Sequence, residues 1–338
     1  MAVSTFGLDI GRSFIKVVQL KISGNKRVLM AAASVNVPAG GIESESPVDL
    51  QKVSDVIKTL RAGAKIDTRR CSVSIVESQV VTRLIQMPSL TDKELSAAIH
   101  WEAEQYIPLP LKDVNLQYKV VSRPTTGGAK MDVLLTAAPK RVISKYLSII
   151  KSAGLEVFAI ETESAALSRV LTLASDPATI IVSMGALSTE LVIALYGNVL
   201  FTRSIATGGL TLTRAIQNEF HLPPDQAEEY KQSYGILEDK LSGKIAAILK
   251  PVLDILTSEI LKAVQFTHSH VADSQIVRIV MCGGGAYLPG LAAFLVERTS
   301  LEVSMADPWA SFVKEGLILK LSGQGSVYTV ATGLALRT

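Results

Sequence analysis

The chain has 338 residues, of which 48% are hydrophobic and 19% are charged, and its formal net charge is +3. This length and composition favour two well-buried lobes over one small core or a disordered chain. The cations are interspersed and aromatic residues make up only 5%, which argues against a nucleic-acid-binding protein, because such proteins align cations with phosphates and stack bases on aromatic rings.

The first predicted elements are two strands joined by a Gly-centred turn, in FGLDIGRSFIKVVQL at residues 6–20. A Pro/Gly/Ser loop follows at 37–47. The next stretch has the pattern of an amphipathic helix that ends at Gly63.

A separate unit begins near Cys71. It reads as two alternating strands, a helix whose start at Thr91 is marked by a capping box with Glu94, two strands joined by the flexible TTGGAK, and a closing helix. We interpret residues 71–154 as a β-β-α-β-β-α module inserted into a larger lobe.

A second hairpin then repeats the plan of the first. After a strand and a helix in LEVFAIETESAALSRVLTLA, the stretch IIVSMGALSTELVIAL at 180–195 again reads as strand, Gly turn and strand. When the two copies are aligned on Gly11 and Gly185, Asp9 corresponds to Ser183. At this position, therefore, only the first copy carries an acid.

The rest of the chain alternates helices with strands. A Gly-Gly turn at Gly208 and Gly209 begins a helix, residues 222–270 are mostly helical, and a triple-Gly loop at 283–285 follows a strand and precedes a helix. Strands alternating with helices predict an α/β fold.

The two cysteines, Cys71 and Cys282, lack metal-site spacing, so we interpret them as buried, reduced thiols of a cytosolic protein. The N-terminus has no cationic and apolar signal-peptide pattern. Glu190 interrupts the most apolar region, so we expect no membrane span and a cytoplasmic location.

Several of these motifs can carry chemistry. The first hairpin can wrap backbone N–H groups around a phosphate, and Asp9 can hold a hydrated Mg²⁺, although a plain hairpin explains the same residues equally well. Lys16, in an otherwise apolar strand, either reaches the surface or points into a charged cleft. The triple-Gly loop lets the backbone approach a flat ligand, with a tight turn as the alternative. For Glu228 and Lys231, three residues apart on one helical face, a surface ion pair is the simpler explanation.

The order of these motifs resembles that of the actin-like ATPase superfamily and, within it, the PilM family of type IV pilus assembly proteins. LDIGRSFIKVVQL resembles the phosphate-1 hairpin, GALSTELVI the phosphate-2 hairpin, QAEEYKQSYGI the helix whose Glu and Lys face the ribose, and CGGGAYLPGL the adenosine loop. The closing ATGLALR is also similar to the family.

The resemblance implies an actin-like (ribonuclease H-like duplicated) two-domain fold with an inserted 1C module. The implied parts are the first domain (1A) at 1–70, the 1C module at 71–154, the first domain continued at 155–175, the second domain (2A) at 176–215, a helical 2B subdomain at 216–272, and the second domain continued with a return to the first at 273–338.

The resemblance also implies an ATP and Mg²⁺ site in the cleft between the domains. The implied nucleotide-binding residues are Asp9, Gly11, Arg12, Ser13, Lys16, Gly185, Ser188, Gly208, Gly209, Glu228, Lys231, Gly283, Gly284 and Gly285. Asp9 would hold Mg²⁺ through water, and Glu161 in ETESAAL matches the acid that orients the attacking water in relatives. Most relatives carry a second Asp where this chain has Ser183, so we expect ATP to bind and hydrolysis to be slow or absent.

The placement of the module is similar to that in FtsA and PilM. FtsA ends in a tail with an amphipathic membrane helix, whereas this sequence stops at GLALRT, which favours PilM. That resemblance implies a scaffold that holds the short N-terminal cytoplasmic peptide of PilN, an inner-membrane protein, in a groove between the first lobe and the module. We therefore expect peripheral attachment through a protein partner, without direct membrane insertion.

Two alternatives stay open. An FtsA-like or other filament-forming actin homologue would self-associate head to tail, which needs only complementary ends. A small-molecule kinase of the same superfamily is a weaker alternative, because no catalytic-base or substrate-site signature accompanies the hairpins.

The helix from Thr91 carries an apolar stripe formed by Leu95, Ala98, Ile99, Ala103 and Tyr106. Trp101 lies off this stripe. It either packs against the main lobe or forms a wall of the peptide groove, where aromatic anchors are enriched.

Overall fold

The computed structural model describes residues 5–123, 130–270 and 275–337. The strands are β1 (Phe6–Ile10), β2 (Phe14–Ser23), β3 (Lys26–Asn36), β4 (Arg70–Ile75), β5 (Val81–Pro88), β6 (Val114–Ser122), β7 (Lys130–Pro139), β8 (Glu156–Thr162), β9 (Ala178–Met184), β10 (Thr189–Leu195), β11 (Asn198–Ile205), β12 (Ile276–Cys282) and β13 (Glu302–Met305). The helices are α1 (Pro47–Gly63), α2 (Asp92–Ala103), α3 (Lys140–Ser152), α4 (Glu163–Leu171), α5 (Gly209–Phe220), α6 (Pro224–Tyr234), α7 (Lys244–His270), α8 (Leu291–Thr299), α9 (Leu317–Lys320) and α10 (Thr329–Ala335). Short 3-10 turns are η1 (Glu77–Gln79), η2 (Leu111–Asp113), η3 (Leu241–Gly243), η4 (Gly284–Tyr287) and η5 (Gly325–Tyr328).

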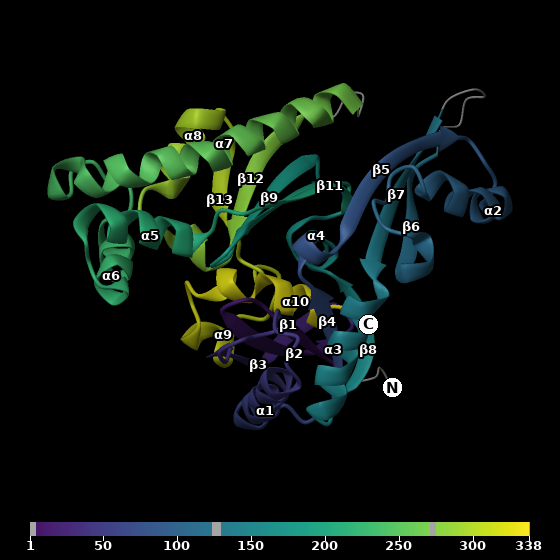
Figure 1. The fold of residues 1–338 in the computed structure, drawn as a ribbon, viewed down its shortest axis with the longest axis horizontal. Helices are drawn as coiled ribbons and strands as arrows, with labels where there is room; N and C mark the ends of the chain where they lie inside the picture. The colour runs from purple at the N-terminus through teal and green to yellow at the C-terminus, as the bar shows by residue number, and fades with distance from the viewer. Residues whose placement is uncertain (1–4, 124–129, 271–274, 338) are drawn as a thin grey trace.

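Two five-stranded sheets of the same topology form the two lobes (Figure 1). Their strand orders are β3-β2-β1-β4-β8 and β11-β10-β9-β12-β13. In each sheet the first three strands in chain order pair antiparallel as a meander. The fourth strand pairs parallel with the first, and the fifth pairs parallel with the fourth. This duplication confirms the predicted two-domain actin-like fold.

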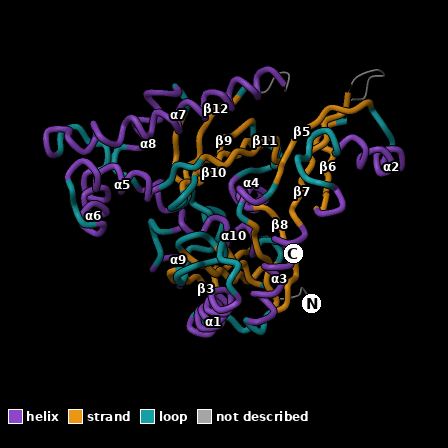
Figure 2. Tube along the Cα trace, in the orientation of Figure 1, coloured by secondary structure: helices purple, strands orange, loops and turns teal. Residues whose placement is uncertain are grey.

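Helices cover the sheets because each sheet has apolar residues on both faces. The core of the second lobe combines β9, β10 and β12 with apolar side chains of α5, α7 and α8, and Figure 2 shows these helices gathered on the outer side of that sheet. Between the two sheets lie α4 and α10 (Figure 1), whose Ala166, Leu167 and Leu334 are fully buried against Ile181 and Val192 of the second sheet.

The inserted module is smaller than the predicted 71–154. Strand β4 pairs parallel with both β1 and β8, and buried Tyr146 and Ile149 of α3 belong to the core of the first lobe. The alternation in CSVSIV suggested a half-exposed strand, but Ser72 and Ser74 are fully buried with their apolar neighbours. The module therefore comprises α2 and a three-stranded sheet of order β5-β7-β6.

The sheet of the module has two different neighbours. One face packs on α2 through buried Leu95 and Ile99, and the other turns Leu134 toward the core between the lobes. Strand β5 also contacts β11 of the second lobe. The module thus touches both lobes, although it is inserted in the first.

Local predictions in this region are borne out in part. The capping box at the start of α2 is confirmed, since Glu94 N donates to Thr91 Oγ1 at 3.4 Å and Thr91 N to Glu94 Oε2 at 2.8 Å, and α1 ends at Gly63 as predicted. Trp101 is 75% exposed, so it does not pack against the main lobe. Residues 125–129 of the predicted TTGGAK connection lie outside the described residues.

Of the helices in the part of the chain that the structure describes, none combines the length and the apolar character that crossing a bilayer requires.

Candidate functional site

The first hairpin holds an acid, Asp9, and a lysine, Lys16, side by side close to its turn. Asp9 and Lys16 are directly paired residues of β1 and β2, so their side chains lie on the same face. Lys16 Nζ donates to Asp9 Oδ2 at 3.0 Å, and Asp9 is only 3% exposed. Lys16 therefore points at the acid and not to the surface.

The second hairpin has the same turn and register with different chemistry. Gly11 N donates to Phe14 O at 3.1 Å, and Gly185 N donates to Ser188 O at 2.9 Å. Where the first hairpin pairs Asp9 with Lys16, the second pairs Ser183 with Glu190. The charge at the lysine position is thus inverted, a feature that the predictions from sequence missed.

Glu190 is buried among hydroxyl groups. Both Ser188 Oγ and Ser204 Oγ donate to its Oε1 at 2.8 Å, while its Oε2 has no hydrogen-bond partner among the described residues. Burial raises the pKa of Glu190 from its ordinary 4.5 to about 7, and the nearby carboxylate of Glu77 acts in the same direction. The hydroxyl of Ser188, predicted to face a nucleotide, is therefore engaged by Glu190.

This pKa predicts that folding stability falls as pH rises. The folded state holds the Glu190 proton more tightly than the unfolded chain, so the contribution is complete below pH 4.5 and lost above about pH 7. Glu190→Gln keeps the shape without titrating, and we expect it to exceed wild type in unfolding free energy by up to about 3 kcal/mol near pH 8 and only slightly near pH 5. Urea unfolding at both pH values measures this; the same difference at both would contradict the assignment.

The Gly-Gly helix start packs directly on the second hairpin. Gly209 N donates to Gly185 O at 2.9 Å, and a Cβ on Gly208 would lie 2.6 Å from Ala186 O, so only glycine fits there. Lys231 Nζ donates to Gly209 O at 3.1 Å and to Glu228 Oε2 at 2.6 Å. The predicted residues of α5, α6 and the second hairpin therefore meet at one place.

Glu228 and Lys231 form the ion pair that their spacing suggested, but it is tied to α5. Thr213 Oγ1 donates to Glu228 Oε2 at 2.6 Å, and Gln232 Nε2 donates to Oε1 at 2.8 Å. Although partial burial opposes the charge, hydrogen bonds from Lys231, Thr213 and Gln232 keep the pKa of Glu228 below its usual range. A fixed carboxylate therefore stands beside the Gly-Gly turn.

The triple-Gly loop lies against the same hairpin. Gly283 has φ +83°, and a Cβ there would lie 2.5 Å from Met184 O, next to the turn. Gly284, by contrast, faces open space, with no described atom within 4 Å of a Cβ position. Cys282, just before the loop, is buried and unpaired as predicted, and burial raises the pKa of its thiol to about 12.

Arg12, in the turn of the first hairpin, is held by first-lobe residues. Its Nη2 donates to Ser78 Oγ at 3.0 Å, and its Nε lies 2.9 Å from Glu43 Oε1. It therefore braces the turn against η1 at the base of the module, while Ser13 O accepts a hydrogen bond of 2.8 Å from Val37 N.

Glu161, the predicted catalytic acid, is paired with two arginines. Both of its oxygens bind Arg169, at 2.5 and 2.7 Å, and Arg337 also donates to it. Its side chain is 5% exposed, and Arg169 in turn donates to Gly333 O of α10 at 2.8 Å. The acid is thus the counter-ion of two arginines, and its catalytic role stays a prediction from the resemblance.

The acids that do gather between the lobes are Glu163 and Glu77, and the predictions missed both. Glu77 N donates to Glu163 Oε2 and Ser164 N donates to Glu77 Oε2, each at 3.3 Å. Burial, then Asp9, Glu190 and Glu77, raise the pKa of Glu163 well above its usual range. Glu163 lies two residues after Glu161, at the start of α4 behind the N-cap Thr162, and that capping pattern is the signal that could have identified it.

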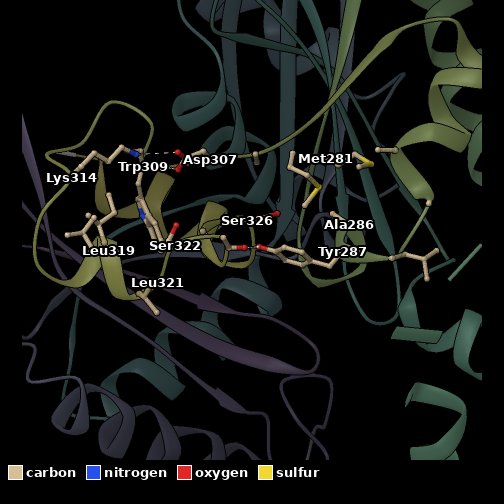
Figure 3. A pocket seen from close by; sticks show the side chains of 18 of the residues that line it. Met281, Ala286, Tyr287, Asp307, Trp309, Lys314, Leu319, Leu321, Ser322 and Ser326 are labelled. Atoms are coloured by element: carbon tan, nitrogen blue, oxygen red, sulfur yellow. Dashed lines mark hydrogen bonds and ion pairs between the residues drawn. The ribbon is translucent and has the colours of Figure 1, made fainter. Parts of the chain in front are cut away.

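A cavity of about 770 Å³ lies behind the triple-Gly loop (Figure 3). Its walls come from η4, α8 and β13 of the second lobe and from the segment 306–326 that returns to the first. Tyr287 crosses it, with its hydroxyl donating to Gly323 O at 2.7 Å. Its lining includes none of the predicted nucleotide-binding residues, so it is separate from the hairpin site.

Comparison with known proteins decides the family. Residues 7–338 match the family described as "Type IV pilus assembly protein PilM". The chain belongs to the PilM family. A chain of the solved "PilM-PilN type IV pilus biogenesis complex" is 29% identical with a TM-score of 0.85, and the match covers 100% of this chain and 99% of that one.

More distant relatives share the fold of this PilM family member. Ethanolamine utilization protein EutJ of Carboxydothermus hydrogenoformans is 16% identical with a TM-score of 0.57, over 100% of this chain and 91% of that one. MreB5 of Spiroplasma citri bound to AMPPNP is 14% identical with a TM-score of 0.56, over 98% and 95%. EutJ of Salmonella typhimurium is 27% identical over 178 residues, which span 53% of this chain and 57% of that relative. The chain thus spans little more than half the length of the curated relative it matches.

Proposed function

We propose that this protein is an ATP-binding, actin-like scaffold of the type IV pilus assembly machinery, which hydrolyses ATP slowly or not at all. The observation that carries the proposal is the pair of hairpins with the same register, one with Asp9 and Lys16 and the other with Ser183 and Glu190. Membership of the PilM family supports the pilus role. The related fold of MreB5, solved with AMPPNP, agrees with nucleotide binding.

The residues fit the phosphates of ATP better than they fit a tightly held metal. Asp9 is a single buried carboxylate already paired with Lys16, and Ser183 adds a hydroxyl without charge. Mg²⁺ accepts one or two carboxylates and keeps several waters, so Asp9 would hold it through water. Lys16 would lie near the phosphates, and the Gly-Gly turn beside Glu228 would receive the ribose.

Slow hydrolysis follows from the protonation of the acids in the cleft. A water-orienting acid must be ionised to accept a proton, and burial next to Asp9 and Glu190 favours the neutral form of Glu163. We assign to Glu163 the position that the sequence suggested for Glu161. The raised pKa of Glu163 and the serine in place of a second Asp both weaken attack by water.

Calorimetric titration with ATP tests the nucleotide site. We expect wild-type protein to bind ATP with nearly the same affinity with and without Mg²⁺, because a single carboxylate, that of Asp9, binds the metal only weakly. Ser183→Asp should restore metal dependence, with roughly tenfold tighter binding in Mg²⁺ for about 1.4 kcal/mol of added interaction. Ser175→Asp, in the loop between α4 and β9, adds the same charge outside the hairpins as a control. Absence of ATP binding by wild-type protein would refute the proposal.

We propose further that the partner is a short N-terminal peptide of a PilN-like membrane protein, which would keep this protein at the cytoplasmic face of the inner membrane. The solved complex of PilM with PilN supports this. Trp101, 75% exposed on the module, is a candidate wall of the groove, since aromatic anchors dominate such interfaces.

The two tryptophans allow a direct test. Trp309 is 2% exposed, so a fluorescence change on adding the synthetic N-terminal peptide of the organism's own PilN-like protein would report Trp101. Because the Trp101→Ala variant lacks this reporter, calorimetric titration with the same peptide compares it with wild type, and we expect the substitution to weaken peptide binding by at least about 2 kcal/mol, as for a hot-spot residue. The exposed Tyr196, on the turn before β11, provides the matched control as Tyr196→Ala. Undiminished binding by Trp101→Ala would exclude Trp101 from the groove.

A further inference from the structure

A second cavity, of about 420 Å³, opens at the far end of β2 from the phosphate turn. It lies beside the tip of the β2–β3 hairpin, and its lining includes Arg27 and Asn25 of that hairpin, Arg169 of α4, Ser311 and Leu336. Its described lining residues include no carboxylate. None of the proposed nucleotide-binding residues contributes to it.

Among the described residues around this cavity, the arginine side chains outnumber the carboxylates that pair with them. Arg169 and Arg337 share one carboxylate, that of Glu161, which is almost fully buried beneath them. Arg27 donates to the neutral Ser311 Oγ at 3.3 Å. These three guanidinium groups and one carboxylate leave two net positive charges. Guanidinium groups can bind phosphate oxygens through pairs of N–H donors.

The tip of the β2–β3 hairpin, beside the cavity, is also positively charged and exposed. Residues 21–27 are all exposed, they include three cations and no acid, and Gly24 makes the turn with φ +56° in open space. Ile22 pairs with Arg27, so both side chains share one face of the ribbon. Lys21 and Lys26 lie on the other face by the same register. Ile22 is 38% exposed beside the arginines.

We propose that this end of the first lobe binds the headgroup of anionic phospholipid. The phosphate would bind at Arg27 and Arg169 with Asn25 and Ser311 beside it, Ile22 would enter the headgroup region, and Lys21 and Lys26 would flank the hairpin on its other face. Cations on both faces of a projecting ribbon, with an apolar side chain between them, complement an extended anionic surface. Binding of a small free anion would require the arginines of the cavity but not Ile22, Lys21 or Lys26.

Sedimentation of the full chain with vesicles, without nucleotide, tests this. We expect binding to phosphatidylglycerol-containing vesicles, none to phosphatidylcholine alone, and loss of binding in high salt. Arg27→Gln should weaken binding roughly fivefold, and Lys21→Gln with Lys26→Gln further by a similar factor per charge. Lys58→Gln on α1, an exposed lysine far along the sequence from the hairpin, should bind like wild type.

Three results would overturn the proposal. Equal weakening by Lys58→Gln would show non-specific charge attraction. If Arg27→Gln bound vesicles as strongly as wild type, the cavity would not take part in lipid binding. Calorimetric binding of inorganic phosphate that depends on Arg27, without vesicle binding, would identify a small-anion site in place of a lipid site. Because the assay contains no ATP or peptide, its outcome is independent of the function proposed above.

Discussion

Gly333→Ala is expected to lower the free energy of unfolding by about 3 kcal/mol or more, as overpacking without room to relax does. A Cβ at Gly333 would lie 2.1 Å from Ala166 O and 2.6 Å from Ala166 C. Both are backbone atoms of α4, which cannot move aside as a side chain would. On the opposite side of α10, a Cβ on Gly7 of β1 would lie 1.9 Å from Ala331 O.

Gly333 lies in α10, the helix at the end of the chain that packs on the first lobe. Because α10 lies between β1 and α4, displacing it disturbs the packing on which both lobes rest. Gly63→Ala is the matched control, since no described atom lies within 4 Å of its Cβ position and alanine favours a helix by up to about 1 kcal/mol. Urea unfolding of both variants measures the contrast. Similar midpoints for the two would show that α10 has room to shift.

Glu161→Gln is expected to cost about 3 kcal/mol of stability while leaving ATP affinity unchanged. Removing one partner of a buried ion pair leaves the other charge uncompensated, and here two arginines would lose the carboxylate that they share. The loss should lie at the low end for buried pairs, because Arg169 and Arg337 are 31% and 41% exposed.

Glu163→Gln provides the contrasting variant. It keeps the shape of the side chain and removes its charge, which burial and the neighbouring acids disfavour, so its stability should equal or exceed that of wild type. Any effect should appear in nucleotide titrations instead. If Glu161→Gln changed ATP binding and left the melting temperature unaltered, the structural role of Glu161 would be refuted.

The duplicated hairpins are the part of the fold that the local sequence pattern predicts best. Their strands are continuous apolar runs around a single glycine, and this pattern determines strand, turn and register without knowledge of the neighbours. The same is true of the capping box at Thr91 and of the helix end at Gly63. These features depend on residues within a few positions of one another.

Two other features depend on residues that are distant in the sequence: the limits of the inserted module and the partners of Glu161. Whether CSVSIV borders a module or lies inside a sheet depends on β8, which follows some 80 residues later in the chain. Whether Glu161 or Glu163 faces the cleft depends on Arg169 and Arg337, because a carboxylate turns toward the cation that can neutralise it when buried.

By itself, the sequence determined the α/β class, the paired Gly hairpins, the order of the Gly-containing motifs and the family. Only the tertiary structure decided that Lys16 points at Asp9, that Glu190 and Glu163 lie near Glu77, and that α10 lies between the sheets. The physical reason is that strand and turn formation follow from local periodicity and backbone sterics. Burial and charge pairing depend on which distant residues come into contact.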